Sequence, residues 1–83
     1  MASFEFVVAN PDGLHARPAA ELVRLASTPG FQVTVGRPNQ PPVNANSILS
    51  LLALGIRSGE RIVVSIDGEN TEPLAQEIGR IFA

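Results

Sequence analysis

The sequence predicts an α+β fold in which helices cover one face of a β-sheet. Three stretches alternate apolar residues with other residues at the period of two that is typical of strands, and three repeat apolar residues at helical spacing. With one short extended segment added, the order along the chain is strand, helix, strand, strand, helix, strand, helix. Because each alternating strand has one apolar side to bury, we expect helices on one face of the sheet.

Composition limits the classes of function. The 83 residues suit one small core, so we expect a single domain over residues 1–83, and 45% hydrophobic with 17% charged residues is a globular composition. The net charge of -2 argues against general nucleic-acid binding. Without cysteine and with one histidine, no metal site or thiol nucleophile is expected. The sequence shows no membrane span and no signal peptide, so we expect a cytoplasmic protein.

The first strand leads into a turn and a helix. The strand is expected over residues 4–9, which alternate two phenylalanines and a valine with other residues. Residues 11–13, Pro-Asp-Gly, form a turn, because proline presets φ and glycine accepts positive φ. Proline is tolerated in the first turn of a helix, so Pro18 predicts a helix over residues 16–27 with His15 at its N-cap.

His15 would therefore lie at the positive end of a helix. The first backbone N–H groups, here those of Ala16 and Arg17, lack partners within the helix and attract anions. Arg17 adds a fixed cation whose geometry suits phosphate. A lone histidine at a helix start is usually a cap or a surface residue. Beside Arg17, the functional interpretation is that His15 becomes phosphorylated and that its neighbours stabilise the product.

The first helix should have one apolar and one charged face. The apolar positions at helical spacing are Ala19, Leu22, Val23 and Ala26. The opposite face carries Arg17, Ala20, Glu21 and Arg24. In the simplest interpretation this charged face is solvated and Arg17 pairs with Glu21, which is worth only about 0.2–0.5 kcal/mol. In the other interpretation it contacts a partner.

The middle of the chain predicts two strands and a short helix. A strand is expected over residues 31–36, and the prolines of the next loop restrict any strand at residues 43–45 to a short one at a sheet edge. A helix over residues 48–54 follows, with Ser47 as its N-cap and Gly55 just beyond its end.

This short helix carries more apolar side chains than one core can cover. With Leu51 facing the core, the others lie on its flanks or outside. These are Ile48, Leu49, Leu52, Ala53 and Leu54. A contiguous apolar patch beside the histidine turn would indicate a docking surface, whereas the alternative is that a loop covers Leu52.

A strand and a helix complete the chain. The strand is expected over residues 61–67, and Asn70 or Thr71 caps the helix that follows. Its buried stripe is Leu74, Ile78, Ile81 and Phe82. Gly79 inside this helix should cost about 1 kcal/mol relative to alanine.

The segment GLHARPAA at residues 13–20 resembles the active-site signature of the HPr family, the histidine-containing phosphocarriers of the bacterial sugar phosphotransferase system. Residues 46–56 resemble the second signature of this family, so the likeness spans nearly the whole chain. It implies an open-faced sandwich, a four-stranded antiparallel sheet covered on one face by three helices.

The resemblance also implies roles for residues and partners. His15 would accept a phosphoryl group on Nδ1 from phosphoenolpyruvate-dependent enzyme I and pass it to an enzyme IIA, while Arg17 and Ala16 help to hold it. Partners would dock transiently on a surface made by Ala20, Arg24, Ile48, Leu49 and Leu52. We expect a monomer that needs no cofactor and binds neither nucleic acid nor membrane.

Three alternatives stay open. The chain could be a domain of a larger fructose- or dihydroxyacetone-linked multiphosphoryl transfer protein. A regulatory binding protein of the same fold is weakened as an alternative by the presence of His15 and Arg17. A hydrolase with His15 as general base is weaker still, because no second acid–base residue is placed beside it.

The chain departs from the family pattern at several positions. Asp12 stands where a small neutral polar residue is common, and its carboxylate would stabilise a cationic His15 and repel a phosphoryl group. Three positions where a cation is frequent in the family are uncharged, namely Ser27, Asn46 and Ser50. Docking to acidic partners would then depend more on Arg17, Arg24 and apolar contact.

Ser47 has two interpretations. In one branch of the family the matching serine is phosphorylated by an ATP-dependent HPr kinase, which inhibits transfer at the histidine. The other interpretation is that Ser47 is only a helix cap, which would by itself explain a serine at this position.

Overall fold

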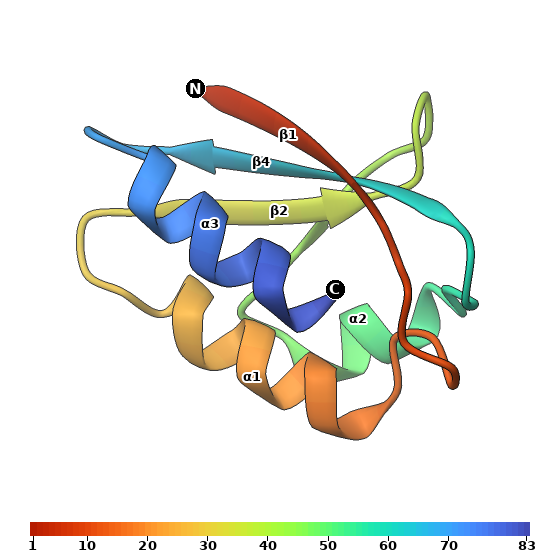
Figure 1. Ribbon diagram of the computed structural model, residues 1–83. Helices are drawn as coiled ribbons and strands as arrows, with labels where there is room; N and C mark the ends of the chain where they lie inside the picture. The colour runs from red at the N-terminus through yellow and green to blue at the C-terminus, as the bar shows by residue number, and fades with distance from the viewer.

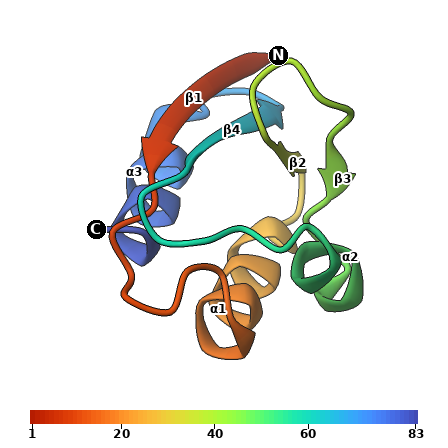
Figure 2. The same cartoon turned by 90° about the vertical axis from the view of Figure 1, so that its right-hand side faces the viewer.

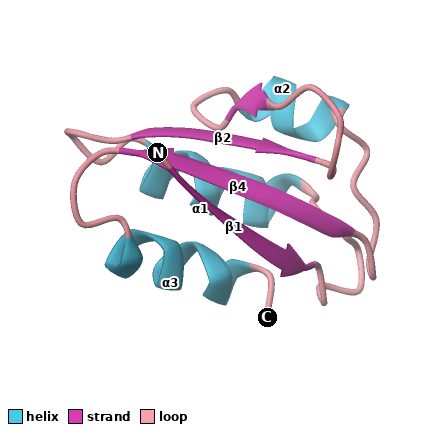
Figure 3. Ribbon diagram, turned by 90° about the horizontal axis from the view of Figure 1, so that it is seen from above, coloured by secondary structure: helices cyan, strands magenta, loops and turns pink.

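The computed structural model describes residues 1–83 and confirms the α+β fold. Its elements are β1 (Ala2–Val7), α1 (Ala16–Ala26), β2 (Gln32–Gly36), β3 (Val43–Asn44), α2 (Ile48–Ala53), β4 (Arg61–Asp67) and α3 (Glu72–Ile81). The strands form one antiparallel sheet in the order β1-β4-β2-β3. The three helices lie on one side of this sheet (Figure 1), and the view onto the other side shows the strands in front of the helices (Figure 3).

The core lies between the sheet and the helices and contains only apolar side chains. It has 18 buried hydrophobic residues and no buried polar residue. The central strand β4 contributes Ile62, Val64 and Ile66, all fully buried, and its bounds are those predicted from the alternation. No helix is long and hydrophobic enough to act as a membrane span.

The buried face of α1 is broader than predicted. Ala19, Leu22 and Ala26 are buried as expected, but Val23 is only half-buried, and Leu25, which the prediction left out, is buried. The reason is the position of α1, which packs against α2 on one flank and α3 on the other (Figure 2). An apolar arc that meets two neighbouring helices must extend beyond the stripe that faces the sheet.

β1 begins and ends two residues earlier than predicted. Val8 is fully buried but pairs with the turn before β4 instead of continuing the ladder. Its N–H donates to the Glu60 carbonyl oxygen at 2.9 Å, and its own carbonyl oxygen accepts from the Gly59 N–H at 2.7 Å. The end of β1 is thereby fixed to the turn that precedes β4.

α2 and β3 agree with the prediction to within one residue. The Ser47 Oγ accepts a hydrogen bond from the Ser50 N–H at 3.2 Å, which confirms the N-cap. The helix ends at Ala53, one residue before the expected end, with Leu54 as its C-cap, and Gly55 follows with a φ of +64°. β3 is a two-residue strand at the sheet edge, as the adjacent prolines predicted.

The contact between α3 and Phe6 of β1 explains why α3 contains Gly79. A Cβ on Gly79 would lie 2.8 Å from Cε1 of Phe6, whose ring stacks on Phe82 with the ring centroids 6.3 Å apart. Of the predicted stripe, Leu74, Ile78 and Phe82 are buried, whereas Ile81 is half-buried. Thr71 occupies the N-cap position, but contrary to the expectation its side chain makes no capping bond.

Candidate functional site

The loop between β1 and α1 packs against the segment that follows α2. The Gly13 N–H donates to the Asn10 carbonyl oxygen at 2.9 Å, which closes the predicted turn, and the Leu14 N–H donates to the Ile56 carbonyl oxygen at 3.1 Å. Gly13 has a φ of +66°, and a Cβ there would collide with the Ile56 carbonyl oxygen and the backbone of Arg57. Only glycine therefore fits where this loop meets the chain after α2.

His15 occupies the N-cap of α1, as predicted. Its backbone is extended, with φ of -97° and ψ of -169°, and its side chain makes no capping bond. The His15 N–H donates to the Gly13 carbonyl oxygen at 3.1 Å, and the His15 carbonyl oxygen accepts from the Ala19 N–H at 3.0 Å. The backbone of His15 is thus held at both sides, while its exposed imidazole has no hydrogen-bond partner in the protein.

The first turn of α1 presents two free donors beside this imidazole. The N–H groups of Ala16 and Arg17 have no partner in the protein, and Pro18 has no N–H. The Ala19 N–H is already bonded to His15. Two unpaired donors at the positive end of a helix favour an anion at this position.

An open cleft of about 420 Å³ runs from His15 between α1 and α3. Its walls carry three arginines and two glutamates together with polar and apolar side chains. The lining residues are Asn10, His15, Arg17, Pro18, Glu21, Arg24, Leu25, Glu77, Arg80 and Ile81. The structure therefore brings His15, Arg17 and Arg24 to one cleft.

The ion pairing on α1 differs from the prediction. Glu21 pairs with Arg24, one turn further along the helix, at 2.9 Å between Oε2 and Nη2, and not with Arg17. This hydrogen-bonded pair lowers the pKa of Glu21 and raises that of Arg24. Arg17 and Arg80 make no ion pair and no side-chain hydrogen bond, so both guanidinium groups are available to an anionic ligand or partner.

Three polar residues of the cleft, Asn10, Glu77 and Arg80, were missed by the sequence reasoning. The Asn10 Nδ2 donates to the Ile81 carbonyl oxygen at 2.8 Å, and the Ala9 N–H donates to the Phe82 carbonyl oxygen at 2.8 Å. These bonds join the loop at residues 8–15, which we call the histidine loop, to the end of α3. The Asn10 Oδ1 is buried without a partner. No sequence signal marks these residues, because their proximity depends on how α3 crosses the sheet.

A patch of exposed apolar residues lies on α2. We call Ile48, Leu49 and Leu52 the α2 patch; they are 37%, 78% and 38% exposed. No loop covers Leu52, so that alternative is wrong. Ala20 is exposed on α1, which packs against α2, and Figure 2 shows both helices at the end of the molecule that carries the histidine loop.

Comparison with known proteins agrees with this geometry. Residues 2–83 match the family model described as the PTS HPr component phosphorylation site. The chain is 42% identical to the phosphocarrier protein HPr of Streptomyces coelicolor, over 87% of this chain and 77% of that protein. It is 36% identical to a multiphosphoryl transfer protein of Salmonella typhimurium, over 98% of this chain but only 22% of that protein.

Solved structures have the same fold. An HPr structure from Thermoanaerobacter tengcongensis superimposes with a TM-score of 0.86 and 33% identity, over 99% of this chain and 91% of that one. A mycoplasma histidine-containing phosphocarrier superimposes with a TM-score of 0.83 and 31% identity, over 96% of this chain and 90% of that one. With its whole length matched, its fold shared and a histidine in the signature segment, the chain belongs to the HPr family, the phosphocarriers of the phosphotransferase system.

Proposed function

We propose that His15 is the phosphoryl acceptor and donor of this phosphocarrier. In the first step, a ring nitrogen of His15 attacks the phosphorus atom carried by phosphoenolpyruvate-charged enzyme I. The new P–N bond forms as the bond between phosphorus and the donor breaks. In the second step, a nucleophile of enzyme IIA takes the phosphoryl group and His15 is regenerated. The free, exposed imidazole at the N-cap is the observation that carries this proposal.

The surroundings of His15 supply the stabilisation that this chemistry needs. The unpaired N–H groups of Ala16 and Arg17 would bond to phosphoryl oxygens, and the unpaired Arg17 guanidinium would neutralise their charge. These donors are already oriented by the helix, so they need no rearrangement when charge develops in the transition state.

Donor and acceptor would use the same surface in turn. The α2 patch and Ala20 of α1 offer apolar contact, whereas Arg24, in the last turn of α1, adds a cation on the side of the cleft. A small exposed patch suits a transient complex, which has to dissociate before the next partner binds. We propose enzyme I and enzyme IIA as these partners, and a monomeric carrier that acts in the cytoplasm.

Two forms of this function are compatible with the relatives. The chain could act as a free-standing carrier over residues 1–83, or as the HPr-like domain of a larger multiphosphoryl transfer protein. The match to the Salmonella protein over 98% of this chain supports the second form. The mass of the gene product in its native cells distinguishes them.

The test is a reconstituted relay. The chain is incubated with phosphoenolpyruvate and enzyme I, and an enzyme IIA is then added. We expect one phosphate on the wild type and its transfer to enzyme IIA, whereas a His15→Ala variant takes up none. If several enzyme I preparations charge a known HPr but not this chain, the proposal is wrong.

A further inference from the structure

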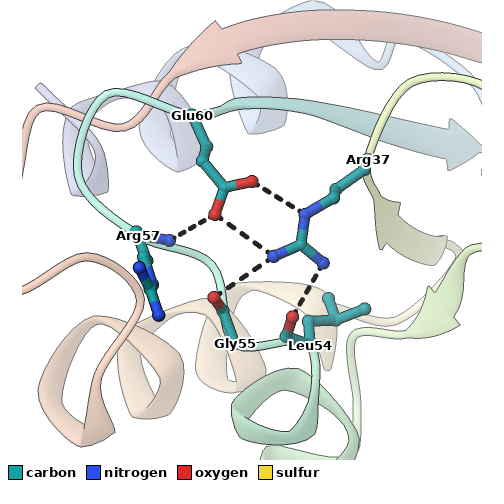
Figure 4. Close-up of polar contacts among 5 residues, drawn as sticks. All are labelled: Arg37, Leu54, Gly55, Arg57 and Glu60. Atoms are coloured by element: carbon teal, nitrogen blue, oxygen red, sulfur yellow. Dashed lines mark hydrogen bonds and ion pairs between the residues drawn. The ribbon is translucent and has the colours of Figure 1, made fainter.

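One arginine outside the cleft, Arg37, connects separate parts of the chain. The Arg37 Nε and Nη2 donate to the two carboxylate oxygens of Glu60 at 2.7 and 3.1 Å. Its Nη1 donates to the Leu54 carbonyl oxygen at 2.8 Å, and its Nη2 also donates to that of Gly55 at 3.2 Å. Figure 4 shows the guanidinium between the Glu60 carboxylate and these two carbonyl groups.

The Arg37–Glu60 pair is more sheltered than the other ion pairs of the protein. Its two side chains are 27% and 31% exposed, whereas every other ion-paired group is more than half exposed. The Glu60 Oε2 also accepts a hydrogen bond from the Arg57 N–H at 2.7 Å. A bidentate, partly shielded pair with further hydrogen bonds is more rigid than an exposed one.

On one side, this network fixes the segment against which the histidine loop packs. Residues 55–60 contribute the Ile56 carbonyl oxygen that holds Leu14, and the backbone that leaves no room beside Gly13. The Glu60 carbonyl oxygen binds Val8 at the end of β1. Arg37 and Glu60 thus hold the support of the loop that carries His15.

On the other side, the network fixes α2. The last carbonyl groups of a helix lack partners within the helix, and Arg37 binds that of the C-cap Leu54 and that of Gly55, the next residue. α2 has only six residues, so its position depends on contacts outside the helix. Because α2 carries the exposed α2 patch, Arg37 holds the docking surface and the histidine loop in one fixed relation.

We propose that Arg37 and Glu60 are positioning residues for phosphoryl transfer, acting by keeping the α2 patch at a fixed distance and orientation from His15. The inference rests on the proposed function. A partner bound to the α2 patch presents its phosphoryl group at one place, and the imidazole has to be there. Misplacement by about 1 Å can reduce a rate about a hundredfold, even when the change is far from the reacting atoms.

The Arg37→Met variant tests this proposal. The rate of phosphoryl transfer from enzyme I is measured while the concentration of the carrier, which is the substrate in this assay, is varied. Methionine keeps part of the aliphatic volume of Arg37 but removes all four hydrogen bonds. We expect kcat to fall at least about tenfold, because the complex forms but is misaligned. KM should stay within about twofold, because the side chains of the α2 patch remain on the surface.

This pattern differs from the effect of lost stability. An unfolded fraction only lowers the concentration of competent carrier, which raises the apparent KM and leaves kcat unchanged. Phosphoramidate, a small phosphoryl donor that needs no docking, provides a second readout. It should phosphorylate His15 of the variant at close to the wild-type rate, because Ala16 and Arg17 belong to α1 and the His15 carbonyl oxygen is bonded to Ala19 of the same helix.

Two further variants serve as controls. Arg61→Met removes an arginine of the exposed pair with Glu5 and should leave kcat and KM unchanged. Arg37→Lys keeps the charge but cannot bridge both carboxylate oxygens and both carbonyl groups, so it should restore only part of kcat.

Each outcome decides one question. Wild-type kcat in Arg37→Met, or a rise in KM alone, would overturn the positioning role and leave the proposed function intact. An equal loss of rate with phosphoramidate would also overturn it, because the defect would then lie in His15 and not in docking. Failure of the wild type to accept phosphate from enzyme I, by contrast, would overturn the proposed function itself.

Discussion

The carbonyl oxygen of Ile56 lies where a side chain on Gly13 would have to be. Because a backbone atom cannot move aside like a flexible side chain, Gly13→Ala should destabilise the protein by more than about 2 kcal/mol, through a strained positive φ and the collision. Gly55→Ala is a matched control, since Gly55 has a similar φ of +64° but nothing within 4 Å. It should cost about 1–2 kcal/mol. Urea unfolding measures both, and equal losses would contradict the close contact.

Ser47 caps α2 at the start of the helix that carries the α2 patch. Ser47→Ala removes the bond to the Ser50 N–H and should cost about 1 kcal/mol, with little effect on transfer. Ser47→Asp keeps a capping oxygen but adds a charge beside the α2 patch, and should slow the phosphorylation of His15. Unfolding and transfer rates are measured for both. Equal transfer rates would remove the electrostatic argument, and no labelling by an HPr kinase with ATP would leave Ser47 as a cap.

Leu49 is the most exposed residue of the α2 patch, at 78%. Leu49→Glu should therefore leave the free energy of unfolding nearly unchanged and reduce transfer at least about tenfold, because docking loses a desolvated apolar contact. Val7→Glu adds the same charge at a half-exposed position on β1 and should transfer normally. Circular dichroism and transfer rates separate folding from docking. A transfer rate equal to that of the wild type would exclude Leu49 from the docking surface.

Glu60 should make the free energy of unfolding depend on pH in the acidic range. The hydrogen bonds from Arg37 and Arg57 lower the pKa of Glu60 from 4.5 to about 2 in the folded protein. The folded state therefore binds a proton less readily than the unfolded chain. The resulting stabilisation is complete above pH 4.5 and is lost as the pH falls toward 2. Urea unfolding between these values should show a weaker acid dependence for Glu60→Gln than for the wild type. Identical pH profiles would contradict the assignment.

Local patterns predicted most of the fold. The bounds of β4 were correct because turn glycines delimit a regular alternation, and the start of α1 was correct because Pro18 allows few positions in a helix. Gly79 shows the limit of such reasoning. The low helix propensity of glycine predicted only that Gly79 destabilises the helix. The structure shows that the ring of Phe6 lies where a side chain at position 79 would be. A contact between the first strand and the last helix has no local signature.

Part of the candidate site could likewise be predicted from local sequence, and part could not. His15, Ala16 and Arg17 are neighbours in sequence, so the motif and the helix start predicted their arrangement. Arg80 reaches the cleft only because α3 packs beside α1, and the pair of Arg37 with Glu60 joins residues 23 positions apart. These relationships depend on strand order and on the path of a proline-rich loop, which residue periodicity does not specify.

Intact mass spectrometry of the wild type and His15→Ala, before and after incubation with phosphoenolpyruvate and enzyme I, tests the central claim most directly. We expect the wild type to gain the mass of one phosphate, to lose it in mild acid and to keep it in alkali. The variant should gain nothing. An unchanged wild-type mass in a reaction that charges a known HPr, or a phosphate that persists on His15→Ala, would contradict the assignment of His15 as the phosphoryl carrier.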